Sequence, residues 1–175
     1  YGQTMFAHAA DAFAEVAEGR QVTFIPFALA DWDDYADRAI AAMGAFGVVA
    51  NSAHRSSAPA RAILEAEVVM MGGGNPFRLL DTLYHLNVVE GLRQRVLAGA
   101  TRYIGASAGT NVACPSIRTT NDMPVCCPPG FDALGLVPFQ INLHYVDADP
   151  LSTFMGETRD TRIEEFLEEN DCPVL

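Results

Sequence analysis

Residues 67–76, EVVMMGGGNP, decide the fold class of this chain. Residues 67–71 are nearly all apolar, as in a parallel strand that is buried on both faces. Three glycines and Asn75 then form a loop, and Pro76 suits the first position of a helix because its missing N–H costs nothing there. A buried strand, a glycine loop and a helix in this order are typical of an α/β protein.

Strand and helix patterns alternate along the whole chain, without an internal repeat or a linker. Asp31 is expected to cap one of the helices. We expect strands at 21–28, 48–51, 67–71, 101–105 and 139–142, helices at 4–18, 32–46, 88–97 and 157–168, and further helices that begin near 59, 76 and 108. Residues 115–138 are rich in Pro, Thr, Asn and Gly and should be mostly loop. The alternation predicts a single α/β domain over residues 1–175 with a mostly parallel sheet.

Composition excludes several classes of partner. Half of the 175 residues are apolar, which is enough for one domain with a sizeable core. The formal net charge is −11, and the chain lacks the clustered Lys and Arg that nucleic-acid binding requires. The longest apolar run, residues 40–50, is too short for a membrane helix.

Cysteine usage and the chain ends bear on the compartment and the extent of the protein. The four cysteines lack the spacing of a metal site or a disulfide framework, and no signal peptide is visible. We therefore expect a cytoplasmic protein in which Cys126 and Cys127 are free thiols rather than a strained vicinal disulfide. The chain begins on a helix and stops where residues 173–175 open another strand, so we expect the natural protein to have a further first strand and a further C-terminal segment.

A Gly-x-Ser-x-Gly pattern spans Gly105 to Gly109, between an expected strand and an expected helix. In such a turn the serine has a strained backbone, and its small neighbours prevent clashes. The hydroxyl is then held above the sheet, where free N–H groups favour developing negative charge. Ser107 is therefore a candidate nucleophile, and the alternative is an ordinary turn of small residues.

Serine is a weak nucleophile unless a base takes its proton, and the chain has four histidines. His8 and His85 lie in helical patterns and His54 follows a strand, where histidine is usually structural. His144 follows the strand expected at 139–142, so it should lie at the carboxyl edge of the sheet, where α/β sites form. His144 is the candidate base.

An acyl-transfer site also needs donors for the oxyanion. The glycines after the buried strand allow main-chain N–H groups to point inward without a Cβ in the way. We expect an oxyanion hole made of the N–H of Gly73 or Gly74 and that of Ala108. A phosphate-binding loop is the alternative, but neither of the common phosphate-loop patterns is present.

Six strings of the chain are informative together, and they are Val22–Ala28, Gly72–Asn75, Tyr103–Gly109, Ala113–Pro124, Gly130–Leu134 and Gln140–Asn142. In their order and nearly in their spacing, they resemble the dipeptidase E family of serine peptidases. The resemblance implies a three-layer α/β sandwich like that of the class I glutamine amidotransferases, of flavodoxin-like type. It also implies cleavage of dipeptides with an N-terminal aspartate through an acyl-enzyme, with no metal or other cofactor.

The resemblance assigns roles to the catalytic candidates. Carried over by motif, Ser107 is the nucleophile and His144 the general base. Asp122 and a glutamate beyond Leu175 compete for the third position of the triad, and the sequence does not choose between them.

Substrate-binding candidates also follow from the resemblance. Arg159 matches the motif for binding the aspartyl carboxylate, to which a planar guanidinium can donate two charge-assisted hydrogen bonds. Arg78 and Arg118 are weaker candidates for that role. The remaining candidates for substrate binding are Asn75, Thr120 and Asn121.

Three alternative functions stay open on the sequence. A cyanophycinase-like peptidase would share the apparatus, although the Arg159 motif favours the dipeptidase. An α/β-hydrolase esterase would have a longer chain with its acid before the histidine. A non-catalytic homologue would keep the sheet as a binding module. We expect a small acidic dipeptide as substrate and neither nucleic acid nor membrane as partner, and a homodimer is the assembly that we consider.

Overall fold

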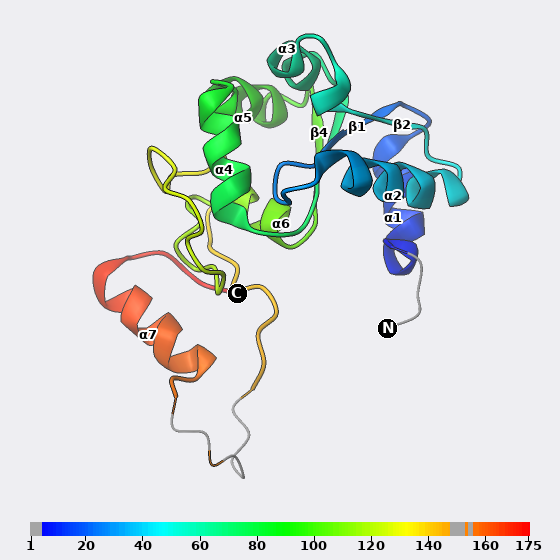
Figure 1. Cartoon of the computed structure of the whole chain (residues 1–175). Helices are drawn as coiled ribbons and strands as arrows, with labels where there is room; N and C mark the ends of the chain where they lie inside the picture. Colours follow the sequence, from blue (N-terminus) through cyan, green and yellow to red (C-terminus); the bar gives the residue numbers. More distant parts are fainter. Residues whose placement is uncertain (1–4, 148–152, 154–155) are drawn as a thin grey trace.

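The computed structural model describes residues 5–147, 153 and 156–175. At its centre is a four-stranded parallel sheet in the order β2-β1-β3-β4 (Figure 1). The strands are β1 (Val22–Ile25), β2 (Ala50–Ser52), β3 (Val68–Met71) and β4 (Arg102–Gly105). The α/β class and the parallel sheet predicted from the alternating pattern are confirmed.

Helices connect the consecutive strands, as parallel neighbours require, and further helices precede β1 and follow β4. They are η1 (Ala7–Ala9), α1 (Ala10–Ala17), α2 (Trp32–Ala45), η2 (Ala53–Arg55), α3 (Pro59–Leu64), α4 (Pro76–His85), α5 (Val89–Leu97), α6 (Ala108–Ala113) and α7 (Arg159–Glu169). Asp31 caps α2 as predicted, because its side chain accepts a hydrogen bond from the N–H of Asp34 at 3.0 Å. Pro76 begins α4, also as predicted.

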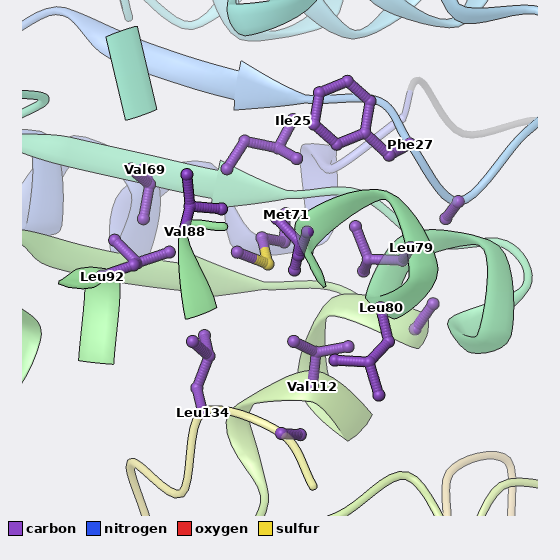
Figure 2. Packing of buried hydrophobic residues seen from close by; sticks show 14 of the residues in the cluster. Ile25, Phe27, Val69, Met71, Leu79, Leu80, Val88, Leu92, Val112 and Leu134 are labelled. Carbon is purple, nitrogen blue, oxygen red and sulfur yellow. The ribbon is translucent and has the colours of Figure 1, made fainter. Parts of the chain in front are cut away.

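The side chains of β3 alternate between two hydrophobic cores, one on each face of the sheet. Val68 and Met70 pack with residues of α1 and α2, whereas Val69 and Met71 pack with residues of α3 to α6 (Figures 1 and 2). All four are fully buried, and such burial stabilises the fold by about 1.5–3 kcal/mol per side chain. The result is a three-layer sandwich with β3 at its centre.

The chain after α6 departs from this layered order. Residues 115–138 are mostly loop, as predicted. The prediction of a strand at 139–142 was wrong in extent, because the structure has only an isolated parallel bridge between Gln140 and Val174. Few main-chain hydrogen bonds join these segments, among them the N–H of Asn142 to the carbonyl of Leu175 at 2.8 Å. Such a short pairing holds the segment in place without extending the sheet.

Two further findings concern the surface and the thiols. No helix within the described residues has both the length and the apolar character needed to cross a membrane. All four cysteines are free, so the prediction of free thiols at Cys126 and Cys127 is confirmed. Helix α7 has no buried residue and lies away from the sheet, at the C-terminal end of the molecule (Figure 1).

Candidate active site

Ser107 lies in the tight turn between β4 and α6. Its backbone has φ 49° and ψ −112°, a strained conformation for a residue with a side chain. A Cβ at Gly105 would meet the main chain of Gly109 at 2.8 Å, and one at Gly109 would overlap the carbonyl oxygen of Met71. Both glycines of the Gly-x-Ser-x-Gly pattern are therefore required by close main-chain contacts.

Two neighbouring hydroxyls hold this turn together. The Tyr103 hydroxyl donates to the carbonyl of Gly109, and the Thr110 hydroxyl donates to the carbonyl of Gly105 at 3.1 Å. Burial raises the pKa of Tyr103 far above its ordinary value, so its hydroxyl stays neutral and can donate. Sequence reasoning did not single out either residue, although Tyr103 lies four residues before Ser107 and Thr110 lies three residues after it.

His144 meets Ser107 across 37 residues of sequence. Its Nε2 lies 3.0 Å from Ser107 Oγ, within the reach of proton transfer. The backbone of His144 has φ 57°, so a left-handed turn presents the imidazole to the serine. The structure thus brings together the two residues predicted as nucleophile and base.

Asparagine side chains position the segment that carries His144. Asn121 Nδ2 donates to the carbonyl of Leu143 at 3.0 Å, and Asn142 Nδ2 donates to the carbonyl of Thr119 at 2.9 Å. These bonds join the loop before Asp122 to the histidine segment in both directions. Asn121, predicted to bind substrate, therefore also supports the segment that carries His144.

Asn111 gives further support and was not singled out by sequence reasoning. It lies four residues after Ser107 on α6 and is buried, and its Nδ2 donates to the carbonyl of Ile141 at 3.1 Å. An amide on the buried face of a helix, one turn from a serine in a Gly-x-Ser-x-Gly pattern, was a signal for this role. It links α6, the helix that follows Ser107, directly to the segment that carries His144.

Ser107 and His144 line a cavity of about 200 Å³. The other residues that line it are Asn111, Thr120, Asn121, Asp122, Leu143 and Arg159. Sites for drug-sized ligands are usually larger, at about 300–1,000 Å³. The cavity is therefore suited to a small ligand, and it gathers most of the predicted catalytic and substrate-binding residues.

A carboxylate and a guanidinium face this cavity together. Asp122 Oδ2 accepts a hydrogen bond from the Thr120 hydroxyl at 3.0 Å, and no hydrogen bond within the described residues joins Asp122 to His144. Arg159 is half-buried at the start of α7, after the cap residue Thr158. Among the described residues, no carboxylate forms an ion pair with Arg159. The geometry therefore places both charges where a ligand can reach them.

The glycine loop, residues 72–75, lies against the nucleophile. A Cβ at Gly73 would lie 3.1 Å from Ser107 Cβ. The N–H of Gly72 donates to the carbonyl of Ile25, the last residue of β1, at 3.2 Å, and the N–H of Asn75 donates to the carbonyl of Ala28 at 2.9 Å. In the described part of the chain, no main-chain carbonyl accepts from Gly74 or from Ala108. These two N–H groups are available to an oxyanion.

Several candidates lie outside the cavity. Asn75 caps α4 through its side-chain oxygen, and its Nδ2 donates to the carbonyl of Met123 at 2.8 Å. It thus ties the glycine loop to the loop that carries Asp122 instead of lining the cavity. Arg78 and Arg118 do not line it either. No cluster of three or more His, Cys, Asp or Glu suited to a metal occurs in the described ranges.

Comparison with known proteins places these features in context. The model of Peptidase family S51 matches residues 1–175. Peptidase E of Streptomyces coelicolor is 49% identical over 176 residues, which cover all of this chain and 72% of that protein. A "Probable alpha-aspartyl dipeptidase" of Drosophila melanogaster is 45% identical over 159 residues, covering 91% of this chain and 66% of that protein.

A solved structure shares the fold. The 1.5 Å crystal structure of a "Putative Peptidase E Protein" from Listeria monocytogenes EGD-e matches with a TM-score of 0.67, over 99% of this chain and 87% of that chain. Its sequence identity is 22%, so this likeness concerns the fold.

Proposed function

This chain belongs to peptidase family S51, and on that premise we propose that it hydrolyses dipeptides with an N-terminal aspartate through a serine mechanism. The observation that carries the proposal is the 3.0 Å approach of His144 Nε2 to Ser107 Oγ in a small cavity that Arg159 also lines. The name of the relative from Drosophila melanogaster supports the choice of substrate class.

The first half of the reaction is acylation of the serine. Ser107 attacks the carbonyl carbon of the aspartyl residue while His144 takes the hydroxyl proton. The turn between β4 and α6 acts as a nucleophile elbow, which holds the hydroxyl toward the cavity at a fixed angle. The N–H of Ala108 and an N–H of the glycine loop stabilise the negative charge that develops on the carbonyl oxygen.

The second half is release of the two products. His144 gives its proton to the leaving amine as the peptide bond breaks, and the C-terminal amino acid departs. Water then attacks the aspartyl ester, again with His144 as the base, and the N-terminal aspartate leaves Ser107. The cavity requires no group beyond water and its own side chains for this sequence of steps.

Selection of an aspartyl dipeptide follows from the two charges at the cavity. The protein carries a formal net charge of −11, so an acidic substrate needs a local cation to offset general repulsion. Arg159 supplies that cation and can bind the β-carboxylate with two hydrogen bonds. The carboxylate of Asp122 is suited to the α-ammonium group, which only a free N-terminus offers.

The cytoplasm is the compartment that we propose. Four free cysteines, one of them exposed, support a reducing environment, since exposed thiols tend to oxidise elsewhere.

Hydrolysis of Asp-Leu by the purified chain, followed as release of free leucine, tests this function. We expect Asp-Leu to be cleaved, Leu-Leu to be left intact, and N-acetyl-Asp-Leu to be cleaved far more slowly because it lacks the ammonium group. A fluorophosphonate probe should label Ser107, as found by mass spectrometry of the digested protein. No cleavage of Asp-Leu together with no label on Ser107 would contradict the proposal.

A further inference from the structure

Tyr35 on α2 lies against the glycine loop at Gly72, the residue before the one that approaches Ser107. A Cβ at Gly72 would overlap the Tyr35 hydroxyl and would lie 2.8 Å from two carbons of its ring. The side chain is 5% exposed, and its ring packs edge-on against Phe24, with centroids 5.1 Å apart. The phenol is therefore held rigidly, with its oxygen at the main chain of the loop.

The hydroxyl oxygen of Tyr35 lies beside the main chain of Gly72 and Gly73. Burial raises the pKa of Tyr35, and the nearby N–H of Gly73 opposes the rise. Gly73 is also the loop residue that approaches Ser107, with 3.1 Å between its Cβ position and Ser107 Cβ. Two consecutive residues of the loop thus contact Tyr35 and Ser107, respectively.

The N–H groups of the four loop residues differ in their hydrogen-bond acceptors. Those of Gly72 and Asn75 are bound by carbonyls of the β1 segment, and that of Gly73 faces the Tyr35 hydroxyl. The N–H of Gly74 has no main-chain acceptor in the described part of the chain. Consecutive glycines rotate freely about φ and ψ, so the hydroxyl of Tyr35 limits how the middle of the loop can turn.

We propose that Tyr35 is a positioning residue for the reaction, whose hydroxyl binds the N–H of Gly73 and so keeps the N–H of Gly74 turned toward the oxyanion at Ser107. This inference rests on the proposed peptidase function and deepens it. An oxyanion donor acts only after the carbonyl has been attacked, so its misplacement lowers kcat and leaves KM nearly unchanged. Complete loss of one such donor costs about 10²–10³ in kcat, and a loosened donor should cost less.

The test is Tyr35→Phe, which removes the oxygen and keeps the packed ring. We expect kcat on Asp-Leu to fall about tenfold with KM within about twofold of wild type, since the affected donor acts in the transition state. Tyr84→Phe is the matched control. It removes a hydroxyl that donates to the carbonyl of Asp132 at 2.9 Å, away from the cavity, and should leave kcat unchanged.

A second readout separates this inference from the substrate assignment. The rate at which a fluorophosphonate labels Ser107 depends on the oxyanion donors and needs no aspartyl side chain. We expect Tyr35→Phe to slow labelling by about the same factor as it lowers kcat, and Tyr84→Phe not to slow it. If the wild type is labelled but does not cleave Asp-Leu, the substrate assignment fails and the labelling rates still test Tyr35.

Three outcomes would overturn the inference. Unchanged kcat and labelling in Tyr35→Phe would show that the hydroxyl does not position the loop. Faster turnover would mean that the N–H of Gly73 is itself the oxyanion donor and that the hydroxyl competes for it. Equal falls of kcat in Tyr35→Phe and Tyr84→Phe, with equal falls in melting temperature, would indicate a general effect on the fold.

Discussion

Two serine–histidine contacts occur among the described residues, each at the carboxyl end of a strand, after β4 and at the end of β2. At the first, Ser107 Oγ lies 3.0 Å from His144 Nε2. At the second, Ser52 Oγ lies 2.7 Å from His54 Nδ1, and His54 Nε2 lies 3.1 Å from Asp33 Oδ1. By distances alone, the second set resembles a complete Ser-His-Asp triad more closely than the first.

The surroundings of the two hydroxyls differ. Ser52 has ordinary extended backbone and is 6% exposed, and its hydroxyl also lies 3.3 Å from the carbonyl of Phe24. Ser107 has a strained backbone and faces a cavity, with the glycine loop against its Cβ. Access for a substrate and nearby oxyanion donors distinguish a nucleophile from a structural serine, and a hydrogen bond to histidine does not.

Replacing each serine by alanine is the strongest test of this contrast. Ser107→Ala should lower kcat on Asp-Leu by about 10⁴-fold or more while the protein stays folded, because the attacking group is gone. Ser52→Ala should leave kcat within about twofold and lower the free energy of unfolding by about 1–2 kcal/mol, because it leaves His54 Nδ1 without its partner. Steady-state kinetics and chemical denaturation measure the two effects. Near wild-type turnover in Ser107→Ala would end the serine mechanism.

Removing the histidines tests the contrast from the side of the base. His144→Ala should be nearly as severe as Ser107→Ala, and the double variant should be no worse, because the pair acts as a unit. His54→Ala should retain most of the activity and melt at a lower temperature. Equal activity losses in the two histidine variants would remove the distinction between a reacting and a structural pair.

Arg159→Ala should have a smaller effect, on selectivity. A charged hydrogen bond contributes about 1.5–3 kcal/mol, so kcat/KM for Asp-Leu should fall at least about tenfold. Slow cleavage of Asn-Leu should hardly change, because this substrate has no carboxylate to pair. The ratio of kcat/KM for the two substrates is the measurement. Equal losses on both would move the search for the specificity group to Arg78 or Arg118.

Asp122→Asn should affect activity less than Ser107→Ala, His144→Ala or Arg159→Ala. Asparagine keeps an oxygen for the Thr120 hydroxyl, and only the attraction for the α-ammonium group is lost. KM for Asp-Leu should rise a few-fold, by about 1 kcal/mol or less, with kcat little changed. A fall in kcat as deep as that of His144→Ala would instead make Asp122 the charged partner of the histidine.

The fold was predictable because its signals are local. Each signal determines the structure of residues only a few positions away. Examples are the cap Asp31, the helix-starting Pro76 and the run of buried strand residues. The strand expected at 139–142 failed because pairing depends on a distant partner. There the partner is the segment around Val174, which meets Gln140 in a single bridge.

The site was predictable only where chemistry and local pattern coincide. Ser107 and His144 stand at ends of expected strands, and the sequence indicated both. Asn75 was expected at the substrate, but an asparagine directly before a helix that begins with proline has a competing local role as a cap. Tyr35 and Asn111 lie in helices, where a buried polar residue looks like ordinary core until its partner across the fold is known.

The direct main-chain contact between α6 and β3 means that the turn of Ser107 can open only together with the sheet. No side chain separates Gly109 from the carbonyl of Met71, and the N–H of Ala106 donates to that same carbonyl at 3.0 Å. Amide protons of the turn should therefore exchange with solvent only when β3 itself opens, whereas the exposed His144 segment is held by side-chain amides and opens more easily. On warming, we therefore expect the segment of His144 to open before the turn of Ser107, so that activity is lost at a temperature where the sheet is still intact.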